Sequence, residues 1–356
     1  MEASGFAMLS VLIASILAYF IPAIRNGKRV FSPMPGIIAL RLEIRGNANA
    51  TDNIYTKVVL NASLVFFLIA MFMGYYLLIS NLLPKTQKSV TLVPLLPGIT
   101  ISFSRLLSIL WIIGLSIVIH EYMHYWSSIK QGVSVKSAGI GWAFVFPIAF
   151  VEPDENELLR APLLKRIRIY AAGPAANMFL ALLTYLIIWN LLKPGIFVID
   201  VVEGSPAWNC GIMKGDVILS INDIEVKSLY KLKELISNNE VLKIKILRGN
   251  KVIEIIAKPE KGKLGIIVLP FVPAWPLSSL PLEMLQAVVS SLVWLNGINL
   301  GLAVINALPL FISDGGRVLT DVGQEFKKFE KVTLVVQALT VFLVAQALIG
   351  SIRSLG

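Results

Sequence analysis

Six long apolar stretches, separated by polar segments, limit the possible folds of this chain more than any other feature. Each has 18 or more mostly apolar residues, enough for a helix to cross about 30 Å of hydrocarbon. The stretches lie at 7–24, 58–82, 106–126, 170–192, 284–308 and 332–350. Hydrophobic residues make up 56% of the 356 positions and charged residues only 15%, which excludes an ordinary soluble domain. The sequence therefore predicts a polytopic α-helical membrane protein with about six transmembrane helices.

The first stretch also has the length of the apolar part of a cleaved signal peptide. The residues before it, Met1 and Glu2, lack the positive charge of a signal peptide, and no small-x-small cleavage site follows Phe20. We therefore expect this stretch to be a retained helix.

The net charge of +10 raises the question of nucleic acid binding. The basic residues, however, sit in the loops between apolar stretches and form no single patch with interleaved aromatics, so we expect no nucleic acid partner. The first, third and fifth loops are rich in Lys and Arg, whereas the second holds only Lys85 and Lys88. The positive-inside rule then places the basic loops in the cytoplasm, and both termini and segment 195–282 outside a cell membrane.

A change of composition at Lys193-Pro194-Gly195 marks the start of an inserted domain with ordinary charge content and strand-like runs. We expect strands at 197–202, 217–221, 241–247 and 251–257, a helix at 228–236, and a hairpin turn at 248–250. With Gly204-Ser-Pro-Ala207 and Lys214-Gly-Asp216, this α+β pattern resembles a PDZ domain in permuted strand order. The resemblance implies substrate recognition by strand addition; the alternative is a steric cap that binds no ligand.

The loop between the third and fourth stretches contains a second unusual segment. Residues 139–152 are too apolar for an exposed loop, and too short and proline-interrupted for a membrane span. We expect a membrane-associated β-hairpin whose open edge pairs with an unwound substrate, or a hairpin that only packs on the helices.

The predicted organisation has four parts. They are 1–104, two N-terminal helices and their loops; 105–194, a helix, the hairpin and a second helix; 195–270, the PDZ-like domain; and 271–356, the last helices.

The chain has only two histidines, His120 and His124, and both lie on the third apolar stretch. Four residues apart on a helix, they share one face and can bind a single Zn²⁺, with Glu121 between them as a general base. Ionisable residues in a membrane span are costly and usually mark function. The sequence therefore predicts one zinc ion per chain.

A catalytic zinc normally has three protein ligands, so a third must come from elsewhere. The best candidate is Asp314, just after the fifth stretch. Pro309 would end the preceding helix, and Gly315-Gly316 would permit a tight backbone that turns the carboxylate towards the metal. Because the third and fifth stretches both run inwards, all three ligands reach the cytoplasmic side, within roughly 10 Å of the interface.

These motifs resemble those of the site-2 protease family. The likeness rests on the H-E-x-x-H of His120 to His124 and on N-x-x-P-x-x-x-x-D-G from Asn306 to Gly315, with the PDZ-like insert between them. It implies zinc binding by His120, His124 and Asp314, base catalysis by Glu121, and a substrate-positioning or oxyanion-stabilising role for Asn306. The family's Gly-Pro-x-x-Asn element is present at 173–177, which we interpret as helix packing, and Ser313 departs from the Leu that often precedes Asp-Gly.

The resemblance implies an intramembrane zinc metalloendopeptidase that cuts in or near the transmembrane segments of single-span membrane proteins, as in regulated intramembrane proteolysis. One alternative is a metal-binding membrane transporter or a PDZ-bearing scaffold, but no other His or Cys lies in any span. Another is a membrane zinc protease with a glutamate as third ligand, for which Glu283 lies too near the outer end of its span.

Overall fold

The computed structural model describes residues 3–21, 25, 27–44, 46–50, 53–81, 95–274 and 276–353. The chain forms two compact units. The first unit combines Met1–Leu183 with Val293–Gly356, and the second is Thr184–Leu292. The predicted inserted domain, 195–270, falls within the second unit.

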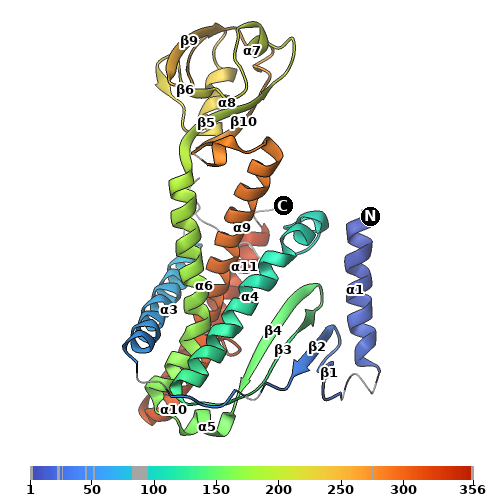
Figure 1. Cartoon of the computed structure of the whole chain (residues 1–356), viewed down its shortest axis with the longest axis vertical. Helices are drawn as coiled ribbons and strands as arrows, with labels where there is room; N and C mark the ends of the chain where they lie inside the picture. The colour runs from blue at the N-terminus through green and yellow to red at the C-terminus, as the bar shows by residue number, and fades with distance from the viewer. Residues whose placement is uncertain are drawn as a thin grey trace. The chain divides into compact units, whose positions relative to one another are not determined.

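Five helices in the described part of the chain are long and apolar enough to cross a membrane. They are α3 (Ile54–Ser80), α4 (Phe103–Gln131), α6 (Leu163–Leu191), α9 (Leu282–Ala307) and α11 (Glu330–Arg353) (Figure 1). The first apolar stretch forms α1 (Ala3–Tyr19), a helix of 17 residues that falls below this length. The expected stretch runs on to residue 24, but residues 22–24 lie outside the described part of the chain, so the expected sixth span stays a prediction. The protein is an integral membrane protein with several apolar helices.

Local sequence signals set the ends of α4, the helix that carries both histidines. Ser102 caps its start by accepting a hydrogen bond from the Arg105 backbone N–H, and Gly132 ends it in the left-handed conformation at φ 83°. Asn53 caps α3 in the same way through the Tyr55 N–H. Pro174 lies inside α6 and removes one helical hydrogen bond there.

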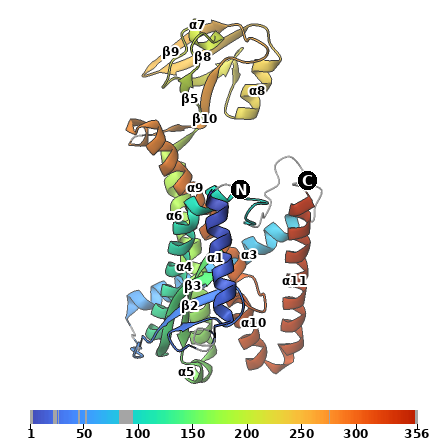
Figure 2. The ribbon, with the colours of Figure 1, turned by 90° about the vertical axis from the view of Figure 1, so that its right-hand side faces the viewer.

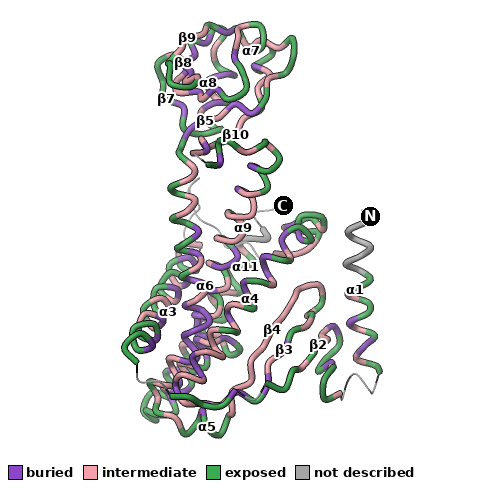
Figure 3. Tube along the Cα trace, viewed as in Figure 1, coloured by how far each residue is buried: buried purple, intermediate pink, exposed green. Residues whose placement is uncertain are grey.

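Small residues hold the helices of the first unit close together. Ala171 of α6 and Ala303 and Ala307 of α9 are completely buried beside Phe67 of α3. Figure 3 shows buried residues gathered where α4, α6 and α9 run side by side, with exposed residues on the outward faces. Many outward residues are large and apolar, as a lipid environment requires.

A four-stranded antiparallel sheet lies beside α4 in the first unit, in the order β1-β2-β3-β4. The strands are β1 (Val30–Phe31), β2 (Ile37–Leu42), β3 (Val135–Ala143) and β4 (Phe146–Pro153). The expected hairpin is therefore present as β3 and β4, with Ala143 paired to Phe146 at its tip. The sequence did not predict β1 and β2, which extend the hairpin from a segment about 100 residues earlier. A short helix, α5 (Glu155–Arg160), follows β4.

The second unit holds a six-stranded sheet in the order β10-β5-β6-β8-β9, with β7 paired to β6 (Figure 2). Its elements are β5 (Leu192–Val201), α7 (Pro206–Asn209), β6 (Val217–Ile221), β7 (Ile224–Glu225), α8 (Leu229–Ser237), β8 (Leu242–Arg248), β9 (Lys251–Ala257) and β10 (Ile266–Pro273). The expected helix and strands are all found, whereas α7, β7 and β10 were not predicted. Branched residues of β6 and β8 pack on α8 to form the core.

Candidate metal centre

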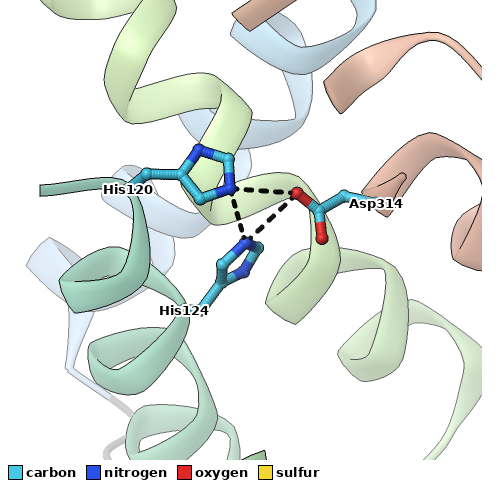
Figure 4. A group of neighbouring side chains, drawn as sticks. All are labelled: His120, His124 and Asp314. Atoms are coloured by element: carbon cyan, nitrogen blue, oxygen red, sulfur yellow. Dashed lines mark hydrogen bonds and ion pairs between the residues drawn. The ribbon is translucent and has the colours of Figure 1, made fainter. Parts of the chain in front are cut away.

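Three side chains converge where α4 meets the start of α10 (Asp314–Glu325) (Figure 4). The Nε2 atoms of His120 and His124 are 3.1 Å apart. Asp314 Oδ2 lies 3.1 Å from His120 Nε2 and 3.2 Å from His124 Nε2. The side chains are only 8, 12 and 13% exposed for His120, His124 and Asp314. The structure thus brings together the three predicted ligands, although 194 residues separate His120 from Asp314.

These separations fit a tetrahedral zinc ion. Zinc binds nitrogen and oxygen at about 2.0–2.1 Å, so tetrahedral ligand atoms lie about 3.3 Å from one another. The donor set of two imidazoles and one carboxylate also suits zinc, and it leaves a fourth position for water or substrate. No other cluster of three His, Cys, Asp or Glu side chains with this geometry occurs among the described residues.

Gly173 of α6 provides the space that an ion between these ligands needs. A Cβ atom built on Gly173 would lie 2.4 Å from His124 Nε2 and 2.6 Å from His120 Nε2. Any side chain at this position would therefore occupy the place where the ligand atoms converge. The absence of a side chain here is a requirement of the site.

Neutral groups on α6 orient the two imidazoles through their other nitrogen atoms. His120 Nδ1 donates to Asn177 Oδ1 at 2.6 Å, and His124 Nδ1 donates to the Ile169 carbonyl at 2.8 Å. With the proton on Nδ1, each Nε2 keeps its lone pair for the metal. Residues 173–177 were interpreted as helix packing, and the structure corrects this because Gly173 and Asn177 both contact the ligands. Helix α6 begins at Leu163 rather than 170, which places this motif inside the helix, level with the histidines.

Asn177 belongs to a buried polar network that joins three helices. Its Nδ2 donates to Asn299 Oδ1 of α9 at 2.8 Å and to the Ser116 carbonyl of α4 at 3.1 Å. Asn299 Nδ2 donates in turn to Ser116 Oγ at 2.9 Å. All three side chains belong to residues that are fully buried. The network fixes the Asn177 amide, and through it the His120 ring.

The turn that carries Asp314 is built as the sequence predicted. Helix α9 ends at Ala307, two residues before Pro309, and Ser313 caps α10 by accepting from the Gly316 N–H at 3.1 Å. A Cβ on Gly316 would lie 1.7 Å from the Leu310 carbonyl oxygen, so only glycine permits this turn. From α11, Gln337 Nε2 donates to the Gly316 carbonyl at 3.0 Å.

The electrostatics of this turn favour a bound cation. Burial raises the pKa of the Asp314 carboxyl, but His124 and His120 in their protonated forms, through their charge and their hydrogen bonds, hold the pKa below its ordinary value. The carboxyl is therefore anionic, the form that binds a metal. Farther along α10, Arg166 of α6 contacts Asp321 at 3.2 Å and Glu325 at 2.9 Å, which fastens α10 against α6.

Glu121 lies outside the ligand group and follows His120 directly on α4. It lines a cavity of about 390 Å³ between α4 and the sheet. Val151 of β4 and Ile140 of β3 lie on the sheet side of this cavity, and Tyr122 lies on the α4 side. Most of the lining is apolar, and Glu121 is the charged residue among the lining residues that the structure describes.

Asn306 is on the last turn of α9, and its Nδ2 donates to the Leu302 carbonyl of the same helix at 3.0 Å. Among the described residues, this is the one hydrogen bond found for the Asn306 side chain, and it does not connect Asn306 to the metal ligands. Its assigned role in substrate positioning or oxyanion stabilisation stays a prediction.

The comparison with known families identifies this arrangement. The model of peptidase family M50 matches residues 108–346, more than half of the chain and all of the residues of the metal centre. The chain belongs to peptidase family M50. This membership confirms the resemblance to site-2 proteases, since the match includes both sequence motifs.

Individual proteins match the chain over shorter regions. The chain is 33% identical over 220 residues to an uncharacterized protein, MJ0971, of Methanocaldococcus jannaschii, covering 58% of this chain and 56% of the relative. It is 29% identical over 205 residues to the probable membrane metalloprotease ARASP2 of Arabidopsis thaliana, a match that covers 43% of this chain and 46% of the relative. It is 28% identical over 205 residues to the putative zinc metalloprotease Cj1068 of Campylobacter jejuni, a match that covers 48% of this chain and 55% of the relative. The matched regions thus span about half the length of these relatives.

Proposed function

We propose that this M50 family member is an intramembrane zinc metalloprotease that hydrolyses peptide bonds in or near the transmembrane segments of membrane-anchored substrates. The observation that carries the proposal is the convergence of two imidazoles and one carboxylate, with ligand atoms within 4.8 Å of one another, inside a unit of apolar helices. A buried site of this kind serves peptide bonds that lie within the membrane.

Each residue of the centre has a defined task. His120, His124 and Asp314 hold the ion, and Gly173 leaves room for it. When bound, zinc lowers the pKa of a water molecule and polarises the scissile carbonyl. Glu121 accepts the proton of the attacking water and then passes it to the leaving amine.

The cavity beside Glu121 is the proposed position of the scissile segment. It continues into a second apolar cavity of about 540 Å³ that shares Val118, Ile140 and Ala149 with it. A helical substrate hides its carbonyls in hydrogen bonds, so it must unwind before it is cut. An unwound segment can lie between α4 and the sheet and pair with β4, which pairs with β3 alone among the described strands.

The charge distribution supports a sidedness for the enzyme in a cell membrane. Basic residues flank the start of α3, the end of α4 and the start of α6, which supports a cytoplasmic location for these ends. His124 lies seven residues before the end of α4, so the centre is roughly 10 Å from that end. The PDZ-like domain at the other ends of α6 and α9 is then outside, where it recognises a substrate strand or excludes bulky substrates.

Substitution at Glu121 tests the mechanism without removing a ligand. The expected result for Glu121→Gln is about one zinc per chain and no cleavage of a transmembrane peptide, because the amide cannot accept the proton. His124→Ala should lose both metal and cleavage. Metal analysis and a cleavage assay on both purified variants make the comparison. Normal turnover by a zinc-loaded Glu121→Gln enzyme would refute the proposed role of Glu121.

A further inference from the structure

A cationic cavity of about 230 Å³ lies in the first unit at the ends of three helices, and shares no residue with the metal centre. It is formed where the first turns of α3 and α6 meet the last turn of α4. Its polar lining consists of Lys57, Lys130, Lys165, Arg168 and Gln131, and its apolar lining of Ala50 and Leu60. Four cationic side chains therefore face one small space, and no acidic side chain is among the lining residues that the structure describes.

The hydrogen bonds that the structure gives to two of these cations do not neutralise their charge. Lys165 Nζ donates to the Gln131 carbonyl at 3.0 Å, and Arg168 donates through one terminal nitrogen to the Asn61 side-chain oxygen. Both acceptors are neutral. These bonds therefore leave the charges of Lys165 and Arg168 unneutralised, and the electrostatic cost is greatest near the low-dielectric interior of a membrane protein. A bound anion would offset the charges of these two side chains.

Two buried polar groups of the lining also lack partners. Arg168 Nε is buried and has no hydrogen-bond acceptor. Gln131 is only 6% exposed, and its side-chain oxygen has no donor. Rotation of the Gln131 amide presents its NH₂ group instead, since the two orientations have the same shape. Lysine and arginine offer several donors and no acceptor. The lining is thus suited to a ligand with several anionic oxygen atoms.

The position of the cavity points to the source of such a ligand. Helix α4 ends at Gln131, α3 begins at Ile54 and α6 begins at Leu163, so the cavity is level with the ends of three candidate membrane spans. Lipid phosphates lie near this level, just beyond the hydrocarbon edge at about 15 Å from the membrane centre. Basic pockets between membrane helices on the cytoplasmic side bind anionic headgroups, and the proposed topology puts this end in the cytoplasm.

We propose that this cavity binds the phosphate group of an anionic phospholipid headgroup. The four cationic side chains surround the phosphate, while the acyl chains run along the exposed apolar face of α3, where Ile54 and Val58 are 65 and 58% exposed. A zwitterionic headgroup binds less tightly, because its choline or ethanolamine cation meets the same four positive charges.

Lipid binding at this cavity acts on the metal centre through α6. The Arg168 carbonyl accepts a hydrogen bond from Ser127 Oγ of α4 at 3.1 Å, and the next carbonyl, of Ile169, orients His124. A phosphate held by Lys130 of α4 and by Lys165 and Arg168 of α6 draws these helices together at that level. Anionic lipid should therefore slow the loss of zinc to a chelator. An effect on cleavage rests on the proposed function, whereas lipid binding does not.

The test uses the full-length chain, purified in detergent and incubated with phosphatidylglycerol, with phosphatidylcholine, or with inorganic phosphate alone. Native mass spectrometry measures the bound lipid. The double variant Lys57→Gln/Lys130→Gln removes two of the four cavity charges. The control Lys327→Gln/Lys328→Gln removes the same charge from the same proposed membrane face, outside the cavity. Circular dichroism and metal content establish that each variant is folded.

We expect the cavity variant to bind phosphatidylglycerol at least tenfold more weakly than the control variant and the unaltered chain do. All three should bind phosphatidylcholine only weakly. Equal binding of phosphatidylglycerol by the cavity variant and the control would overturn the proposal. If millimolar inorganic phosphate displaces phosphatidylglycerol, the cavity is a site for free phosphate, and the proposal that it binds a lipid headgroup is wrong. If no variant or unaltered chain cleaves a peptide, the proposed function fails while these binding ratios still decide the lipid site.

Discussion

The cores of the two units differ in the polar side chains that they bury beside their apolar residues. In the second unit, branched residues such as Ile218, Ile244 and Ile246 are fully buried, as in a protein that folds in water. In the first unit, the fully buried residues include Ser116, Asn177 and Asn299, while large apolar residues face outwards. Polar residues buried among membrane helices are costly and usually serve a function. The difference between the cores therefore indicates that the functional site lies in the first unit.

Of the changes considered, Gly173→Ala should have the largest effect, and that effect should be confined to the metal centre of the first unit. The added methyl group would lie 2.4 Å from His124 Nε2, so zinc content and cleavage should both fall to near zero while the second unit stays folded. Gly297→Ala on α9 is the matched control, because a Cβ there meets nothing within 4 Å. Metal analysis and circular dichroism measure the two effects. A Gly173→Ala chain with full zinc content would show that the ion lies elsewhere.

Asn177→Ala should weaken zinc binding by about 10- to 100-fold, the usual effect of removing a partner that orients a metal ligand. The reason is that His120 loses the acceptor that holds its Nδ1 proton. Competition with a chelator measures the affinity. Asn190→Ala, at an exposed asparagine on the same helix, should leave the affinity unchanged. A purely structural role for Asn177 would lower the stability of the chain but not its zinc affinity at a temperature where the chain is folded.

Ser313→Ala should have a smaller effect, because it removes a helix cap rather than a contact to a ligand. A lost cap costs about 1 kcal/mol, which we expect to appear as a several-fold loss of zinc affinity, since Asp314 is the next residue. Ser313→Thr should restore most of it. Ser102→Ala removes the equivalent cap of α4 far from the ligands, and should not alter zinc affinity. Equal losses in both alanine variants would mean that the cap acts only through overall stability.

Replacement of 197–268 with a short Gly/Ser linker should have the smallest effect on the centre. Phe197 and Leu269 are paired in the β5–β10 ladder, so a short linker can join the remaining ends. Zinc content and cleavage of a minimal transmembrane peptide should persist, and the choice among full-length substrates should change. The assay compares both substrate types in liposomes. Failure of a folded, zinc-loaded variant to cut the minimal peptide would assign the second unit a part in assembling the site.

The ligands could be found from the sequence because each depends on a local rule. A four-residue spacing places His120 and His124 on one helix face, and the predicted common direction of two spans brings Asp314 to the same level. The supporting residues could not be found in this way. The contact between His120 and Asn177 joins residues 57 apart, and neither neighbourhood alone indicates it. The pairing of β2 with β3 is equally non-local, so only half of that sheet was predicted.

The distance along the chain between His120 and Asp314, 194 residues, also matters while the protein is being made. When α4 and α6 enter the membrane during synthesis, the two histidines and Glu121 are present but the third ligand is not. The ligand set closes only after α9 has been inserted and α10 has formed behind it. A partly synthesised chain, or one truncated before Asp314, therefore lacks the complete ligand set.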